Sequence, residues 1–255
     1  MEISKEKRKR RGNSRYYLFY FVSLVLVTSL GIATWFTLTH VKLFALKHVV
    51  VTGNTAIPDS LIQKATSSYM GMNLLAISRK DITCRLAGFS RIKDVKLRKK
   101  LLHTIQLEIT ERKGLIYLKS LEGDLYPIDA DAIVLAKYSS VYSEDLPIFS
   151  TYFSSKQFKA GQKLKKPGLG RILALHQRIA KEAPDFLPRI SEYYFIDNTV
   201  NIIDAKYGTR IIPSDEDLAS QLKRYLFVQD NGNIDRRGVV DLRFKNQVVV
   251  KAGNK

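Results

Sequence analysis

The first feature in the pattern of apolar and polar positions is an unbroken apolar run near the beginning of the chain. Residues 16–39, YYLFYFVSLVLVTSLGIATWFTLT, contain no charged side chain. As a helix, a run of this length would extend about 36 Å, which is enough to cross the hydrocarbon core of a bilayer. We predict a transmembrane helix over 16–39. A cleaved signal peptide is the alternative, because small residues at 29–33 offer cleavage sites.

The positions after this run predict a small mixed domain over residues 40–113. Val49 and Val51 alternate as in a strand, and two helices are expected over 58–69 and 79–87. A hairpin follows, whose second arm places apolar residues at every other position of 105–109. The expected order is β-α-α-β-β, with both helices on one face of the sheet. We expect Cys84, in the second helix, to be a small buried thiol.

A second domain is predicted over residues 114–252, with a longer sheet and two helices, and 253–255 form a short tail. The first helix is expected over 168–181, and the second from Asp215 to about Gln229, opened by a capping arrangement of Ser214 and Asp217. A turn is predicted at residues 197–198 between two strands. The chain is therefore assigned to the α+β class.

The last strand pair predicts an exposed sheet edge. Leu242 and Phe244 alternate with charged residues, and residues 248–250 are a run of valines that no later segment can pair with. An unpaired edge is either a docking site or an aggregation hazard. The alternatives are that another strand hides this edge, or that nearby lysines guard it.

The charge of the chain points to a membrane rather than to nucleic acid. The formal net charge is +18, and the first 15 residues hold seven basic and two acidic side chains. By the positive-inside rule this tail stays in the cytoplasm, and it can contact anionic lipid, while the chain after the helix is exported. No nucleic-acid-binding motif accompanies the charge, so we predict no nucleic-acid partner. The basic residues of the tail are Lys5, Lys7, Arg8, Lys9, Arg10, Arg11 and Arg15.

Candidate chemistry in the sequence is weak. The four histidines lie far apart and are expected at the surface or in an interface. Asp129 and Asp131 are the most suggestive carboxylate pair, but aspartates in a hairpin more simply accept hydrogen bonds from the turn backbone. No phosphate loop or nucleophile motif is present. We therefore predict no catalytic, metal or cofactor site and no enzymatic activity.

Several short motifs resemble the FtsQ/DivIB family of bacterial cell-division proteins. Val49-x-Val51-x-Gly53-Asn54 is similar to that family's I-x-V-x-G-N, and residues 71–74 and 110–112 are similar to its G-x-N-L and T-E-R. VDLRF at 240–244 resembles the I-D-L-R-[FY] of the terminal hairpin. Departures occur at residues 101–102, where Trp-Pro is common, and at Gly114 and Ala132. The resemblance covers residues 1 to about 252.

This resemblance implies a fold and a function. The fold would be one membrane helix, a POTRA domain and a second β-rich domain. The function would be a non-enzymatic, bitopic scaffold at the division septum of the cytoplasmic membrane, which recruits FtsB-like (DivIC-like) and FtsL-like proteins and further division proteins through the POTRA domain. The partner strand would add at the terminal edge, at Phe244, Gln247, Val248, Val249, Val250 and Lys251. An exported POTRA-type assembly or secretion factor is the alternative, and a membrane-anchored enzyme or wall-binding protein is the third class.

Overall fold

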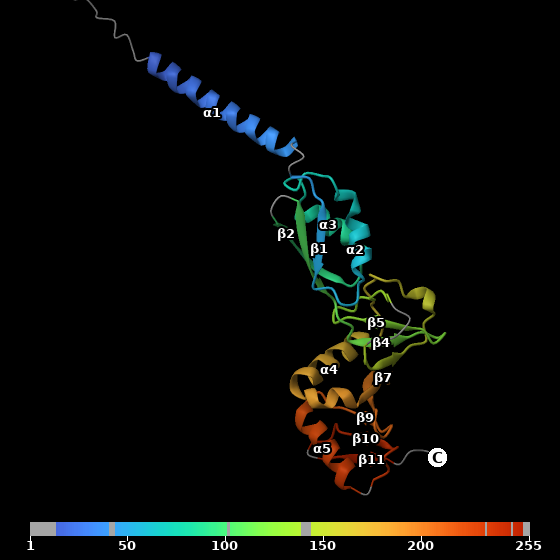
Figure 1. Cartoon of the computed structure of the whole chain (residues 1–255). Helices are drawn as coiled ribbons and strands as arrows, with labels where there is room; N and C mark the ends of the chain where they lie inside the picture. Colours follow the sequence, from blue (N-terminus) through green and yellow to red (C-terminus); the bar gives the residue numbers. More distant parts are fainter. Residues whose placement is uncertain are drawn as a thin grey trace, which may run out of the picture.

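The computed structural model describes residues 14–40, 44–100, 103–138, 144–232, 234–245 and 247–251. It has the predicted α+β architecture: an apolar N-terminal helix, a β-α-α-β-β domain and a β-rich domain (Figure 1). Helix α1 spans Ser14–His40, and its segment Tyr16–Thr37 has a mean hydropathy of 1.9 with exposed side chains throughout. In length and composition this helix can cross a membrane.

The first domain is a three-stranded sheet with two helices on one face (Figure 1). Its strand order is β1-β3-β2, with β1 parallel and β2 antiparallel to the central β3. Ile105, Leu107 and Ile109 of β3 are buried under the helices, as their alternation predicts. The elements are β1 (His48–Thr52), α2 (Asp59–Thr66), the 3₁₀ turn η2 (Ser67–Tyr69), α3 (Arg79–Leu86), β2 (Ile92–Lys100) and β3 (Thr104–Glu111).

The V-x-V-x-G-N and T-E-R motifs stabilise the turn between β1 and α2 through Gly53 and Glu111. Gly53 has a φ of +84°, and a Cβ at this position would stand 2.4 Å from the carbonyl oxygen of Ile109, so only glycine fits. The carboxylate of Glu111 accepts hydrogen bonds from the backbone N–H groups of Ala56 and Ile57, both at 2.9 Å. The end of β3 therefore fixes the entry to α2.

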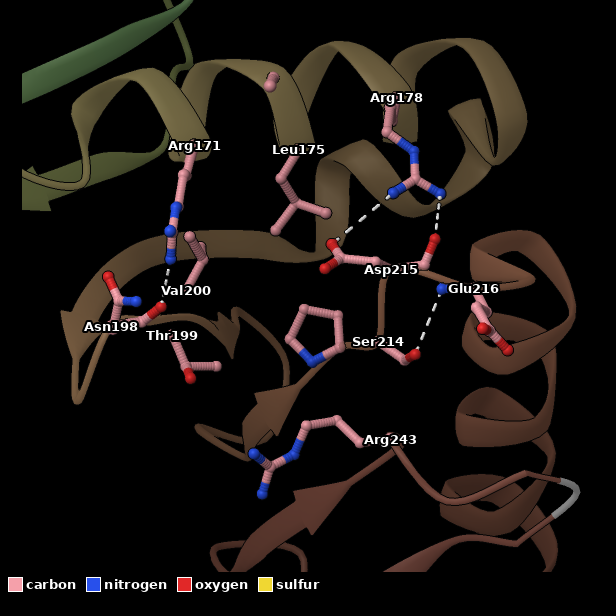
Figure 2. A pocket seen from close by; sticks show the side chains of 12 residues that line it. Arg171, Leu175, Arg178, Asn198, Thr199, Val200, Ser214, Asp215, Glu216 and Arg243 are labelled. Carbon is pink, nitrogen blue, oxygen red and sulfur yellow. Dashed lines mark hydrogen bonds and ion pairs between the residues drawn. The ribbon is translucent and has the colours of Figure 1, made fainter.

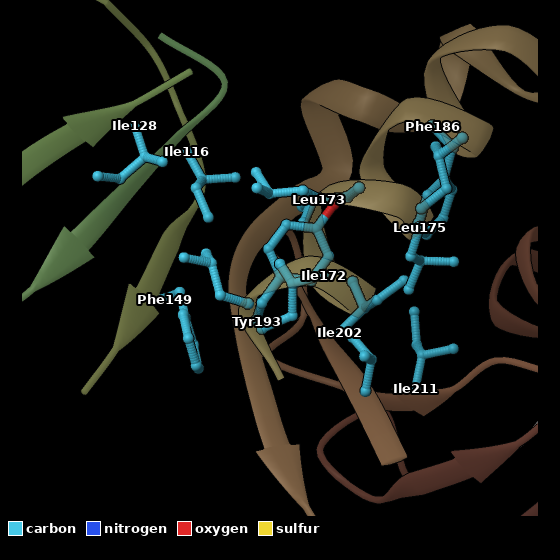
Figure 3. Close-up of a cluster of buried hydrophobic side chains, with 14 of the residues drawn as sticks. Ile116, Ile128, Phe149, Ile172, Leu173, Leu175, Phe186, Tyr193, Ile202 and Ile211 are labelled. Atoms are coloured by element: carbon cyan, nitrogen blue, oxygen red, sulfur yellow. The ribbon is translucent and has the colours of Figure 1, made fainter. Parts of the chain in front are cut away.

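The second domain is one eight-stranded sheet in the order β11-β10-β9-β8-β7-β6-β4-β5. Helices α4 and α5 lie against one face of it (Figure 1), and apolar side chains of both helices belong to the same core as those of the strands. Figure 3 shows the side chains of α4 beside those of the strands. The helical elements are η3 (Ser155–Gln157), α4 (Leu169–Glu182), η4 (Pro184–Arg189) and α5 (Leu218–Asn231). The strands are β4 (Ile116–Lys119), β5 (Leu125–Ile128), β6 (Ile148–Ser150), β7 (Ile190–Ile196), β8 (Thr199–Asp204), β9 (Arg210–Ile212), β10 (Val239–Asp241) and β11 (Val249–Lys251).

A buried ion pair joins three elements of this domain. Asp204, at the end of β8, is fully buried and accepts hydrogen bonds from Arg189 of η4 and from the hydroxyl of Tyr225 in α5. Burial alone would raise the pKa of Asp204, but these bonds and the backbone N–H of Lys206 hold it below its usual value. The carboxylate is thus ionised and fully partnered, as a buried charge must be.

Three local predictions about the helices were wrong. Helix α5 begins at Leu218, not Asp215, because Asp217 stands before it in the left-handed region with a φ of +45° and its side chain makes no cap hydrogen bond. Cys84 is exposed, because Ile82 and Leu86 take the buried face of α3. His176 of α4 is buried, not at the surface, and its Nδ1 lies 2.8 Å from the hydroxyl of Tyr193.

Candidate partner-binding edge

The strand predicted to receive a partner lies at one edge of the eight-stranded sheet. β11 pairs antiparallel with β10, with Val239 opposite Lys251 and Asp241 opposite Val249. On its other side, β11 has no neighbouring strand among the residues that the structure describes. The strand begins at Val249, so Gln247 and Val248, which were expected within it, precede it.

The backbone pattern shows which residue of β11 faces outward. The N–H of Leu242 donates to the carbonyl of Ile212, and the N–H of Arg210 donates to that of Gly238. In this parallel pairing the N–H and C=O of Val240 point to β9, so those of its neighbours Val239 and Asp241 point to β11. Lys251 and Val249, which lie opposite Val239 and Asp241, therefore hydrogen-bond with β10. The N–H and C=O of Val250, between them, point to the free edge.

The side chains of this segment divide between the core and the solvent. Val248 and Val250 are partly buried and pack against the core of the second domain, while Gln247 and Lys251 are exposed. Phe244, the predicted apolar anchor, is 49% exposed, and its carbonyl accepts the N–H of Gln247 at 3.2 Å. An exposed phenylalanine therefore stands at the turn that leads into the edge strand.

The VDLRF motif ends β10 through an ion pair. Arg243 binds both carboxylate oxygens of Asp241, with Nε at 2.9 Å from Oδ1 and Nη2 at 2.6 Å from Oδ2. The hydrogen bonds from Arg243 lower the pKa of Asp241, although its burial opposes this. Because the backbone N–H of Arg243 also bonds Asp241 at 3.1 Å, the chain curls after Asp241, so Phe244 lies in a turn and not in the strand predicted from its alternation with Leu242.

A cleft of about 740 Å³ lies between α4 and the end of the sheet where β8 begins and β9 and β10 stop (Figure 2). Three arginines line it: Arg171 and Arg178 from α4, and Arg243. Arg171 donates to the carbonyl of Asn198 at 2.6 Å, and Arg178 to that of Asp215 at 3.1 Å. Asp215 and Glu216 are the acidic residues of the lining. Arg178 also pairs with Glu182 and Asp215, and Arg243 pairs with Asp241, which leaves Arg171 as the lining arginine without an ion pair among the described residues. An anionic group would therefore bind at Arg171.

Sequence reasoning missed this cleft. The available signal was the spacing of Arg171 and Arg178, which puts two cations on one face of α4 two turns apart. The third cation, Arg243, comes from a distant segment, so its approach to α4 depends on the order of the strands.

The other candidate residues take structural positions. Asp129 accepts hydrogen bonds from the backbone N–H groups of Asp131 and Ile133, as expected for a hairpin turn, and both aspartates bind Arg112 at 2.7 and 2.9 Å.

Burial lowers the pKa of His176. Among the described residues no three His, Cys, Asp or Glu side chains gather as a metal site would require. Arg15 lies in α1, and the remaining predicted tail residues, Lys5, Lys7, Arg8, Lys9, Arg10 and Arg11, are outside the described residues.

Comparison with known proteins gives matches over both domains. The family model described as the FtsQ-type POTRA domain matches residues 44–112. The chain is 26% identical over 163 residues to the cell division protein DivIB of Clostridium botulinum strain Hall, and 25% identical to that of strain Loch Maree. These alignments cover 64% of this chain and 60% of each relative. The cell division protein FtsQ of Corynebacterium glutamicum is 27% identical over 103 residues, which are 40% of this chain and 45% of the relative. The chain thus matches about three fifths of the length of the DivIB relatives.

Proposed function

We propose that the chain, which matches the FtsQ-type POTRA model over residues 44–112 and is similar to DivIB and FtsQ cell division proteins, is a member of the FtsQ/DivIB family and acts in cell division as a bitopic membrane scaffold without enzymatic activity. Helix α1 is its membrane span, the basic tail before it remains in the cytoplasm, and the two domains after it are exported. Two folded domains on one span suit the recruitment of partners across a membrane, and the protein is expected to concentrate at the division septum.

The partner in this proposal is an FtsB-like (DivIC-like) protein with its FtsL-like companion, which adds a strand beside β11. The observation that carries the proposal is the outward-facing N–H and C=O of Val250, on an edge with no neighbouring strand among the described residues. Strand addition draws affinity from such main-chain groups and specificity from adjacent side-chain contacts. Phe244 and the cleft supply those contacts, and an acidic residue of the partner would bind at Arg171.

The opposite edge of the same sheet supports this choice by contrast. β5 carries Pro127, which has no N–H to offer a further strand. The carbonyl of Pro127 already accepts the N–H of Leu135 at 2.8 Å, and a β-bridge joins Ile128 to Val134. The β5 edge is therefore covered by residues 134–135 and carries a proline. The β11 edge has neither a covering segment nor a proline among the described residues.

The test is photocrosslinking in living cells from a probe at Phe244, with Val250→Pro as the disrupting variant. Proline removes the outward N–H, so we expect capture of a small coiled-coil membrane protein to fall at least tenfold. Val250→Thr is the matched control, because it keeps both the N–H and the β-branched shape, and capture should persist. Val249→Pro should damage the pairing with β10 itself and reduce the protease resistance of the second domain.

Full capture by a Val250→Pro chain that retains its protease resistance would refute strand addition. Capture of an envelope assembly or secretion component in place of a division protein would refute the scaffold role and favour the alternative assignment.

A further inference from the structure

The end of the POTRA domain nearest the membrane helix lies close to the point where that helix would leave the membrane. Helix α1 ends at His40, and the described part of the domain begins at Phe44. Four residue steps extend at most about 14 Å, whatever their conformation. If α1 crosses the membrane, the segment that starts at Phe44 must lie close to the leaflet from which the helix emerges.

Three segments meet at this end. The N–H of Leu46 donates to the carbonyl of Met72, and the N–H of Gly71 donates to that of Leu46, both at 2.9 Å. The hairpin between β2 and β3 closes the other side, where the N–H of Lys47 donates to the carbonyl of His103 at 2.8 Å. Lys99 Nζ reaches the carbonyl of Leu75 at 3.0 Å, so this lysine and the apolar loop are neighbours.

The surface formed there combines exposed apolar side chains with cations. Met70, Met72 and Leu75 are 47%, 44% and 44% exposed. Lys47, Lys99 and Lys100 are exposed on the adjoining segments. We name this set of six residues the proximal patch. The described residues of the three segments, 44–48, 70–76, 99–100 and 103–104, include no aspartate or glutamate, whereas the far end of the domain carries Asp59, Asp94 and Glu111.

We propose that the proximal patch rests on the membrane surface, with its methionines and leucine in the headgroup zone and its lysines against anionic phospholipid phosphates. Flexible apolar side chains rimmed by lysine favour an interface where one part is apolar and the other is charged, and lysine stems can lie along it with the ammonium in the headgroups. Three lysines on segments whose described residues include no carboxylate match an anionic surface. The short covalent link to α1 keeps that surface within reach at all times.

This contact would set the tilt of the exported part. The first domain would be held at two places, by the chain at Phe44 and by the patch, so it could not rotate freely about the end of α1. The height of the β11 edge above the bilayer would then be defined, which is what a partner anchored in the same membrane needs. The inference rests on α1 crossing the membrane and not on the identity of the partner.

The test uses the full chain in nanodiscs, with a polarity-sensitive fluorophore on a single cysteine. Cys84→Ser removes the native thiol, and Met72→Cys places the probe in the patch. In discs that contain phosphatidylglycerol and nitroxide-labelled lipid, we expect a blue-shifted emission and strong quenching. The combined variant Lys47→Glu, Lys99→Glu and Lys100→Glu should reduce the quenching at least twofold. Discs in which phosphatidylcholine replaces the phosphatidylglycerol, with the nitroxide-labelled lipid kept, should reduce it as well.

Two further probes make each outcome decisive. A probe at Lys93, an exposed residue at the other end of β2, should remain unquenched in every disc. A probe at Trp35 in α1 should be quenched in every disc, which verifies insertion. An unquenched Met72 probe beside a quenched Trp35 probe would overturn the proposal, and so would Met72 quenching that ignores both lipid charge and the lysine variant. Failure of the Trp35 probe to be quenched would instead contradict the membrane span, on which the proposed function itself depends.

Discussion

Arg112 and Asp129 join the two domains that follow α1 through a hydrogen-bonded ion pair of 2.7 Å between Nη1 and Oδ2. Arg112 directly follows β3 of the first domain, and Asp129 directly follows β5 of the second. Their side chains are 19% and 6% exposed, so the pair is largely shielded from water. A second contact lies beside it, where Arg91 donates to the carbonyl of Ala136 at 2.7 Å. The T-E-R motif therefore ends with a residue that connects domains.

Replacing Arg112 with alanine should loosen this junction. Asp129 would keep its two backbone hydrogen bonds but lose its cation, and a buried carboxylate with an unfilled oxygen costs about 1–3 kcal/mol. Urea unfolding of the chain in detergent, followed by circular dichroism, should show that loss of unfolding free energy. Hydrogen exchange should become faster at the amides of 129–133.

Arg98→Ala is the matched control for Arg112→Ala. Arg98 pairs with Glu108 at 3.1 Å, but both side chains are well exposed, so the change in unfolding free energy should stay below about 0.5 kcal/mol. Equal losses from the two variants would mean that the junction pair contributes no more than a surface pair.

Gly53→Ala should destabilise the first domain. The substitution strains a φ of +84° and drives a Cβ to 2.4 Å from the Ile109 carbonyl, so we expect a loss of at least about 1–3 kcal/mol. Differential scanning calorimetry would show the thermal transition of this domain at a lower temperature. Gly88→Ala is the control, because no atom lies within 4 Å of its added Cβ and its φ is not in the left-handed range. An unchanged transition in Gly53→Ala would contradict the tight approach of the two backbones.

The stability of the second domain should fall in mild acid. Burial lowers the pKa of His176, so the unfolded chain, whose histidine has a pKa of about 6.5, takes up a proton more readily than the folded one. The stabilisation is present above about pH 6.5 and is lost as the pH falls through the folded pKa. Thermal unfolding between pH 7.5 and 5 should show this slope. His176→Gln should flatten it, while Gln177→Ala, at an exposed neutral residue of the same helix, should leave it unchanged.

Elements with regular side-chain patterns were predictable from the sequence. The alternation of Ile105, Leu107 and Ile109 gave β3 with its buried face, because one face of that sheet is covered by helices. The apolar positions of 168–181 predicted α4 within a residue at each end. The turn at Asp197 and Asn198 was predictable since both residues adopt positive φ angles of 49° and 61°, which these residue types tolerate.

Features that depend on neighbours in space were not predictable. Strand periodicity does not say which strand lies beside which, so the insertion of β6 between β4 and β7 required the three-dimensional structure. The same limit hid the outward direction of Val250, which follows from how β9 pairs with β10. The exposure of Cys84 was misjudged because α3 has only eight residues, too few for its buried face to be assigned securely.

The order of strands in the second sheet has a consequence for biosynthesis. After the β4–β5 hairpin, each new strand joins one that precedes it in the chain: β6 pairs with β4, and β7 to β11 each pair with the strand before. A chain made from its N-terminus can therefore build the sheet by accretion, with β11 last. A chain that is still being synthesised, or that is truncated before β11, cannot offer this strand to a partner, because β11 pairs with β10. Strand addition by a partner would then select for fully folded chains, because the edge of β11 exists only after the whole sheet has formed.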